Sequence, residues 1–326
     1  MSWNNAPALQ KLTASQLGGG HGAQIWGVDV RGQLFTTHQQ TAGGEWTRWM
    51  KASEWLPSIT HPKYIYELAA FQLTNDRCRL FALDYKRDIW GIQQDDSGNF
   101  THWWHPSTGY WNRAPAPFKK IAGTHGTKPE GSTAVTSGGA MFIGLKEDGR
   151  FAVCFNTGSD NWSRFRNDWH GVGPAIVEVT ACMQGDGRIA IWAIDDNRQL
   201  WGTGEKSAGS YDFGNWVGPN WLGAPKVRNI AAVQTSKGAA IVVQDEHFAV
   251  RTNFQTSPGS NSWSGWSPQH WNQAPASYEL TAAGLNNGLA QIWAVTMKQN
   301  LTSIVQRDAN TWPTRWTDYD PELPTV

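Results

Sequence analysis

The sequence is poor in cysteine. Its 326 residues contain three, Cys78, Cys154 and Cys182, and each lies within a run that is typical of a β-strand. An odd number of cysteines cannot pair completely, and no short spacing of metal-ligating residues surrounds them. We therefore expect buried, reduced thiols rather than disulfides, a metal site or a redox centre.

Long apolar runs and an excess of one charge are also missing. Lys and Arg number 27 and so do Asp and Glu, with no basic run, so electrostatics favour neither nucleic acid nor an anionic membrane as a partner. No apolar run approaches the roughly 20 residues of a spanning helix, so no membrane insertion is expected. The first residues, MSWNNAPALQ, lack the basic and apolar parts of a secretory signal. We expect a cytoplasmic protein, or one exported without a signal peptide.

Catalytic motifs are absent as well. Nine histidines are scattered, and only the segment Thr101-His-Trp-Trp-His105 brings two together. On a strand, positions 102 and 105 point to opposite faces, so they cannot share a metal. There is no G-x-S-x-G elbow, phosphate-binding loop or H-E-x-x-H pair. We identify no catalytic residue and expect neither a cofactor nor a metal.

Tryptophan, in contrast, is abundant, with 21 residues, and it marks a repeat. Four short connectors read W-x-x-A-P, and two looser versions fill the gaps between them. The connectors begin at Trp3, Trp55, Trp111, Trp169, Trp221 and Trp271. A period of this length is typical of propellers and solenoids. We expect one domain over residues 1–326, with repeats of approximately 3–54, 55–110, 111–168, 169–220, 221–270 and 271–320.

Within each repeat the apolar pattern has period two. A first strand rich in small residues precedes an apolar second strand, a polar turn, a third strand and a fourth strand that carries aromatic residues. Four antiparallel strands repeated six times predict an all-β fold, a six-bladed β-propeller whose ring closes between the C-terminal and N-terminal repeats.

Three sets of residues should occupy equivalent places in this ring. Small residues are expected on the innermost strands, where they surround the axis: Ala14, Ala70, Gly123, Ala181, Ala232 and Ala282. Core positions on the second strands are Trp26, Phe81, Phe142, Trp192, Val242 and Trp293. The aspartates after these strands, Asp29, Asp84, Asp195 and Asp245, are expected to form turns by accepting backbone hydrogen bonds.

The third strand, hairpin and fourth strand carry a family resemblance. Residues 37–49, THQQTAGGEWTRW, and residues 253–266, NFQTSPGSNSWSGW, resemble the repeat of Trp-rich bacterial propeller lectins of the PLL type. A fainter likeness extends to tectonin-like and fungal fucose-binding propellers. The resemblance implies a glycan-binding protein with sugar pockets in the clefts between blades, lined by Trp and polar residues. Tryptophan suits this role because its ring faces stack on the C–H faces of sugars.

Transferred residue by residue, the resemblance places ligand-binding residues in repeats 1, 5 and 6. These are Gln39, Gln40, Trp46, Trp49, Gln255, Trp263, Trp266, Gln306, Trp312 and Trp316. Repeats 2, 3 and 4 depart from the pattern, with Phe100-Thr-His-Trp-Trp104, Trp162-Ser-Arg-Phe165 and a long hairpin before Trp216. Repeated sites that act together are usually kept alike, so we expect at most three functional clefts.

Two other functions fit the same sequence. Lectin-like fungal pericyclases, the hetero-Diels-Alderases, bind a small hydrophobic molecule in one pocket and need no nucleophile or cofactor. Such a pocket would open on the face that carries the connectors and the turns between second and third strands. Its candidate residues are His61, Tyr64, Tyr85, Trp111, His170 and His247. The other possibility is a protein-interaction platform on the exposed loops, and the residues alone leave all three functions open.

Overall fold

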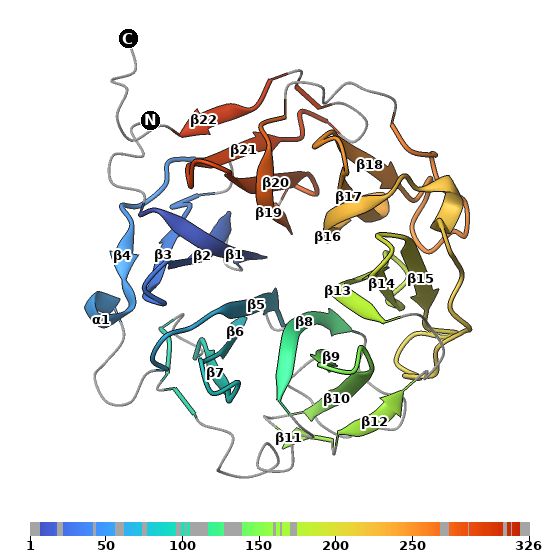
Figure 1. Ribbon diagram of the computed structural model, residues 1–326, viewed down its shortest axis with the longest axis horizontal. Coiled ribbons are helices and arrows are strands. Elements are labelled where there is room, and N and C mark those ends of the chain that lie inside the picture. The colour runs from blue at the N-terminus through green and yellow to red at the C-terminus, as the bar shows by residue number, and fades with distance from the viewer. Residues whose placement is uncertain are drawn as a thin grey trace.

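The structure is a computed structural model that describes residues 7–17, 22–41, 44–55, 62–73, 77–95, 99–101, 103–104, 117–126, 139–158, 161–163, 165–169, 175–267, 274–285, 287–308, 312–313 and 315–319. These residues form six antiparallel sheets around a central axis (Figure 1). The predicted six-bladed β-propeller is confirmed.

Each blade is one sheet of consecutive strands. Blade 1 contains β1 (Leu9–Gln16), β2 (Ala23–Asp29), β3 (Leu34–His38) and β4 (Met50–Lys51), followed by helix α1 (Ala52–Trp55). Blade 2 contains β5 (Glu67–Gln72), β6 (Cys78–Leu83) and β7 (Ile89–Gln93). Blade 3 contains β8 (Phe118–Gly126), β9 (Gly139–Lys146), β10 (Phe151–Gly158), β11 (Asn161–Trp162) and β12 (Arg166–Trp169).

The second half of the ring has the same order. Blade 4 contains β13 (Ile176–Met183), β14 (Ile189–Asp195) and β15 (Leu200–Gly204), and the 3₁₀ turn η2 (Trp221–Gly223) leads out of it. Blade 5 contains β16 (Val227–Thr235), β17 (Gly238–Asp245) and β18 (Val250–Phe254). Blade 6 contains β19 (Ser277–Gly284), β20 (Ala290–Thr296), β21 (Leu301–Val305) and β22 (Thr317–Tyr319).

The fourth strand is less regular than the repeat predicted. Among the described residues of blades 2, 4 and 5, its pairing consists of isolated bridges such as Gln94 to Phe100 and Gln255 to Trp263. Residues that disrupt strands lie beside these bridges: Gly265 has a φ of 80°, and Pro219 follows the last bridge of blade 4. Because this outer position covers no further strand, its pairing is dispensable.

The turns between second and third strands repeat one geometry. In blade 1 the Asp29 carboxylate accepts hydrogen bonds from the backbone N–H groups of Arg31 and Gln33, each at 2.9 Å. The fourth residue of the turn has a positive φ in every blade: Gly32, Arg87, Gly149, Arg198, Phe248 and Gln299. Equivalent backbone bonds are accepted by Asp84, Asp195 and Asp245. The turn-forming role predicted for these aspartates is confirmed.

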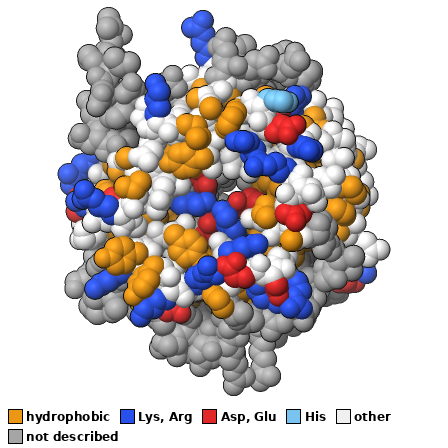
Figure 2. Space-filling model, viewed as in Figure 1, with side chains coloured by type: hydrophobic (Ala, Val, Ile, Leu, Met, Phe, Trp, Pro, Cys, Tyr) orange, Lys and Arg blue, Asp and Glu red, His pale blue; other side chains and the backbone are white. Residues whose placement is uncertain are grey.

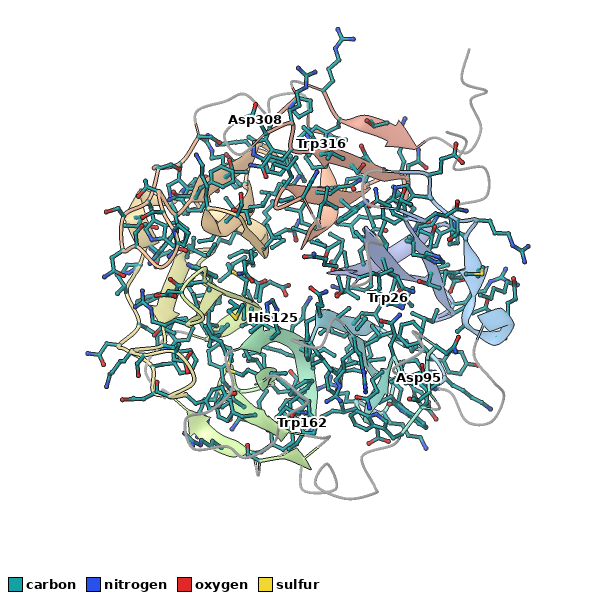
Figure 3. All side chains as sticks on the ribbon, turned by 180° about the vertical axis from the view of Figure 1, so that it is seen from behind. Trp26, Asp95, His125, Trp162, Asp308 and Trp316 are labelled. Carbon is teal, nitrogen blue, oxygen red and sulfur yellow. The ribbon has the colours of Figure 1, made fainter. Side chains whose placement is uncertain are left out.

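Aromatic side chains wedge neighbouring blades together. In blades 1, 2, 4 and 6 a bulky second-strand side chain faces the next blade, whose fourth-strand aromatic residue meets it edge to face. Trp46 contacts Trp293 with ring centroids 5.9 Å apart, and Trp263 contacts Trp192 at the same separation. The corresponding pairs at the other two interfaces are Phe100 with Trp26 and Trp162 with Phe81. Trp162 and Trp316 lie toward the rim (Figure 3). Each such pair contributes about 0.5–1.5 kcal/mol beyond its buried area.

Two interfaces achieve the same packing differently. Blades 3 and 5 carry the smaller Ile143 and Val242 at the equivalent second-strand position. There the aromatic residue of the next blade contacts the third strand, as Trp312 does with Phe254 at 6.4 Å. Phe142, expected at this position, is buried but precedes it by one residue and packs in the cluster shared with blade 2. A shift by one residue moves a strand side chain to the opposite face.

The ring closes between the last and first repeats, as predicted. The Lys11 ammonium lies 2.9 Å from the Glu279 carboxylate, and the Tyr278 hydroxyl donates a hydrogen bond to the Leu9 carbonyl.

The cysteines are free and buried, and burial raises the pKa of each thiol. Among the described residues, no helix is long and apolar enough to cross a membrane.

The six first strands enclose a central cavity of about 410 Å³, and all six predicted small residues line it. His125, near the end of β8, lies beside this opening (Figure 3). Burial lowers its pKa to about 4 despite a hydrogen bond with Gln234.

At the end where the strands begin, Figure 2 shows Lys, Arg, Asp and Glu side chains gathered around the axis. Equivalent register positions in blades 1 to 6 there are Lys11, Glu67, Lys120, Glu178, Asn229 and Glu279.

These side chains, which we call the axial ring, form a chain of ion pairs. Lys11 lies 2.9 Å from Glu279 and 3.5 Å from Glu67. Lys120 lies 3.2 Å from Glu67 and 2.9 Å from Glu178. In blade 5 the Asn229 amide instead bonds to the Gln244 amide at 3.0 Å. The ring therefore alternates in charge except at blade 5.

Proton affinities in the axial ring reflect this arrangement. Burial alone would lower the pKa of Lys120, but Glu178 and Glu67 raise it well above its ordinary value. Burial would raise the pKa of Glu178, and Lys120 and Lys11 outweigh that effect and lower it. Burial raises the pKa of Glu279, which Lys11 and Lys120 offset only in part. Lys120 is thus the main cation that favours the charged form of Glu178.

Candidate functional site

A pocket of about 400 Å³ lies between blades 1 and 2, within the size range of small-molecule sites. Blade 1 supplies residues 31–34, at the turn into β3, and residues 51–53, at the start of α1. Blade 2 supplies the incoming segment 62–65 and Trp103. We call it the blade 1–2 pocket.

A glycine brings the two walls together. Gly32 has a φ of 73°, and a Cβ atom there would lie 2.4 Å from the Tyr64 Cα. The Ile65 N–H donates a hydrogen bond to the Gly32 carbonyl at 3.1 Å, which fixes the incoming segment against the turn. Glycine accepts this φ without strain, and a side chain at residue 32 would require the two walls to move apart.

Two exposed tyrosines stand at the rim. Tyr64 is 64 % exposed and Tyr85 is 60 % exposed, and their rings meet edge to face with centroids 5.7 Å apart. The Lys86 ammonium lies 5.7 Å from the centre of the Tyr85 ring. Single exposed aromatics are common, but a fixed pair beside a pocket offers a rigid apolar surface to a ligand.

Trp103 forms the aromatic floor of the pocket. It is 8 % exposed and belongs to the apolar cluster that joins blades 1 and 2. Trp103 was not among the predicted site residues, because repeat 2 lacks two tryptophans three residues apart. The bridge of Gln94 with Phe100 matches that of Gln39 with Trp46, so Phe100 and Trp103 are the aromatic pair of blade 2. The sequence signal for this pair is an aromatic residue followed three positions later by Trp, with Phe instead of Trp at the first position. Phe213 and Trp216 show the same spacing in blade 4.

The predicted tryptophans lie at interfaces between blades. Trp46 and Trp49 are half-buried against the cluster of blades 1 and 6. Trp263 and Trp266 are half-buried against the cluster of blades 4 and 5. Trp312 and Trp316 pack against the cluster of blades 5 and 6, and Trp316 is buried. A ligand could reach only the part of each ring that this packing leaves exposed.

The predicted glutamines fill a recurring backbone position. Gln39, Gln255 and Gln306 are buried, and each Oε1 accepts a hydrogen bond from the N–H at the start of the second strand, at 2.7–3.0 Å. Gln94 and Glu205 do the same in blades 2 and 4. Gln40 is exposed, and its backbone N–H donates to the Glu45 carbonyl across the hairpin. Three of the four amides thus hold strands 2 and 3 in register.

The residues proposed for a single hydrophobic pocket are only partly brought together. Tyr64 and Tyr85 contact each other in blade 2. His247 lies in the turn of blade 5, across the ring from blade 2 (Figure 1), and its imidazole is 3.9 Å from the Glu246 carboxylate. His61, Trp111 and His170 lie outside the described residues.

Blades 4 and 5 provide a counterpart to the blade 1–2 pocket. The Val227 N–H donates to the Arg198 carbonyl at 2.8 Å, just as Ile65 donates to Gly32. The described residues that line this cleft carry both signs of charge and include no aromatic side chain: Asp196, Asn197, Arg198, Gln199, Lys226 and Glu246. Lys226 takes the place of Tyr64, so these two clefts differ in chemistry.

Comparison with known proteins finds the same fold in several lectins. No family model and no curated protein sequence matches the chain. Among solved structures it is similar to AofleA from Arthrobotrys oligospora, with 12 % identity, a TM-score of 0.67, and 98 % of this chain and 88 % of that chain covered. The fucose-specific lectin from Aleuria aurantia aligns with 14 % identity and a TM-score of 0.65 over 93 % of each chain. The chain has the fold of these six-bladed lectins.

A bacterial lectin shows the same fold. BP39L from Burkholderia pseudomallei aligns with 14 % identity and a TM-score of 0.59, covering 92 % of this chain and 82 % of that chain. At such identities, agreement in fold says nothing of individual ligand contacts.

Proposed function

We propose that this protein binds carbohydrates in clefts between neighbouring blades and that the blade 1–2 pocket is its principal sugar site. The observation that carries the proposal is the composition of that pocket, in which an aromatic floor and an aromatic rim enclose polar side chains. Trp103 and Tyr64 offer ring surfaces, while Arg31, Gln33 and Ser53 offer hydrogen-bonding groups. A sugar needs both, because its C–H faces stack on aromatic rings and its hydroxyls require polar partners.

The comparisons support the proposal at the level of the fold. Several of the similar structures are lectins, and the one from Aleuria aurantia is described as fucose-specific. The clefts beside Trp49, Trp266 and Trp316 are proposed as further, weaker sites, because packing between blades covers much of these rings. Their Gln partners would act by holding the strands in register.

Removing the exposed rim should weaken sugar binding while leaving the fold intact. We expect Tyr64→Ala to reduce affinity about tenfold, because losing about 60 Å² of apolar contact costs about 1.5 kcal/mol. Tyr64→Phe keeps the ring and should bind almost as well as the wild type. The measurement is isothermal titration calorimetry against the methyl glycosides and oligosaccharides that a glycan array selects.

Trp266→Ala serves as the comparison, since it removes an aromatic residue from one of the weaker clefts and should reduce affinity less than Tyr64→Ala does. If Trp266→Ala abolishes binding and Tyr64→Ala does not, the principal site lies between blades 4 and 5 instead. A wild-type protein that binds no saccharide on the array or in the calorimeter would overturn the proposed function.

A further inference from the structure

The charged side chains among the described residues that line the blade 1–2 pocket are all basic. The residues of the described lining that are charged at neutral pH are Arg31, Lys51 and Lys63, and all three side chains are exposed. The chain as a whole is neutral, with 27 basic and 27 acidic residues, so this local excess is not a consequence of composition. The counterpart cleft between blades 4 and 5 carries both signs.

The acidic side chains that adjoin the lining segments of blade 1, Asp29 and Glu54, have partners of their own. Asp29 accepts the backbone N–H groups of its own turn. Glu54 of helix α1 lies 3.5 Å from the Arg48 guanidinium. None of the ion pairs found among the described residues involves Arg31, Lys51 or Lys63. Within the part of the pocket that the structure describes, these three cations are therefore available to a bound anion.

Cationic and aromatic side chains line the same pocket. Tyr64 lines the pocket and contacts Tyr85, and the Lys86 ammonium lies over the Tyr85 ring. Figure 2 shows hydrophobic and cationic side chains intermixed on the face that carries these turns. A guanidinium and two ammonium groups favour an anion, and an aromatic surface favours a sugar ring.

We propose that the blade 1–2 pocket binds an acidic saccharide, whose carboxylate or sulfate group is held by Arg31, Lys51 and Lys63 while a sugar ring lies against Tyr64. This inference rests on the proposed function and specifies its ligand class. Arg31 supplies a planar, bidentate donor, and the two lysines supply point charges that accept either anion. Trp103 forms the apolar floor beneath them.

Matched pairs of sugars test the inference. The wild-type protein is titrated with methyl β-glucuronide against methyl β-glucoside, and with galactose 6-sulfate against galactose. We expect the acidic member of at least one pair to bind about tenfold or more tightly, because a charge-assisted hydrogen bond discriminates by at least that factor. The pair that shows this difference in affinity tells whether the ligand group is a carboxylate or a sulfate. The preference should shrink between about 0.1 M and 1 M salt, as the Debye length falls from about 10 Å to about 3 Å.

Variants assign the effect to the pocket. Arg31→Gln and Lys51→Gln should each reduce affinity for the acidic sugar about tenfold and leave any affinity for its neutral partner unchanged. Lys226→Gln, which removes an exposed lysine from the counterpart cleft, should change neither. These substitutions are on the surface, and equal melting temperatures will show that the fold is retained.

Three outcomes would overturn the inference. Equal affinity for acidic and neutral partners leaves the protein a lectin but removes the acidic ligand. Unchanged discrimination in Arg31→Gln and Lys51→Gln moves the anion site elsewhere. Competition by inorganic sulfate at the same concentration as the sulfated sugar reduces the site to a simple anion site. If no saccharide binds at all, the proposed function fails first.

Discussion

We expect Lys120→Met to lower the free energy of unfolding by about 3–5 kcal/mol at neutral pH, which is the cost of leaving a buried charge without its ion-pair partner. Lys120 lies 2.9 Å from Glu178 and 3.2 Å from Glu67 within the axial ring, and its removal leaves Glu178 without an ion-pair partner among the described residues. For a chain of this length the expected fall in Tm is roughly 4–7 °C, at an unfolding entropy of about 2 cal/mol/K per residue. Urea denaturation followed by tryptophan fluorescence measures the loss.

The matched control is Lys298→Met, which removes an exposed lysine in a turn of blade 6 and should change stability by less than about 0.5 kcal/mol. Adding Glu178→Gln to Lys120→Met removes the stranded carboxylate and should restore part of the loss, because Glu67 keeps Lys11 as a partner at 3.5 Å. Equal stability of Lys120→Met and Lys298→Met would show that the axial ring contributes nothing.

The pH dependence of this loss has a defined sign. The folded state lowers the pKa of Glu178, so the ion pair adds stability above the ordinary carboxyl pKa of 4.5, and that stability disappears as the pH falls through the lowered value. The raised pKa of Lys120 adds stability below the ordinary ammonium pKa of 10.5, which is lost as the pH rises through the raised value. The gap between wild type and Lys120→Met should therefore narrow at both extremes.

Features that repeat locally could be predicted from the sequence. Asp29 and its equivalents bond to backbone groups within four residues, so turn chemistry alone identifies them. Ala14 and its equivalents recur at one place in each repeat, and only the axis of a ring explains small residues there. Period, strand order and ring closure follow from signals of this kind.

Features that depend on contacts between blades could not be predicted. Lys11 and Glu279 are 268 residues apart in sequence, and each taken alone is an ordinary polar residue of a strand. The pocket arises because Tyr64 approaches Gly32 of the preceding blade, and neither residue predicts the other. Gln255 resembled a sugar ligand in sequence, whereas its buried amide bonds to Ala239 and Gln184. A side chain with several hydrogen-bonding groups does not reveal its partners until the fold supplies them.

Trp192→Ala is expected to lower the free energy of unfolding by about 3–5 kcal/mol, the range for truncating a buried aromatic side chain. Trp192 is 2 % exposed and meets Trp221 and Trp263 edge to face, at 6.0 Å and 5.9 Å. Trp192→Phe should cost less, because Phe81 occupies the equivalent register position of blade 2. Val217→Ala, at a side chain that is 59 % exposed, serves as the control in urea denaturation.

A double-mutant cycle that combines Trp192→Ala with Trp263→Ala measures how strongly the two rings stabilise each other. If the two rings stabilise the interface through each other, their coupling energy should be about 0.5–1.5 kcal/mol. If the losses in free energy of unfolding are additive, Trp192 and Trp263 do not stabilise the interface between blades 4 and 5 through each other. Saccharide affinity measured on the same variants then decides the role of Trp263: a stable Trp263→Phe variant that loses binding makes it a sugar contact, and one that binds normally makes it part of the scaffold.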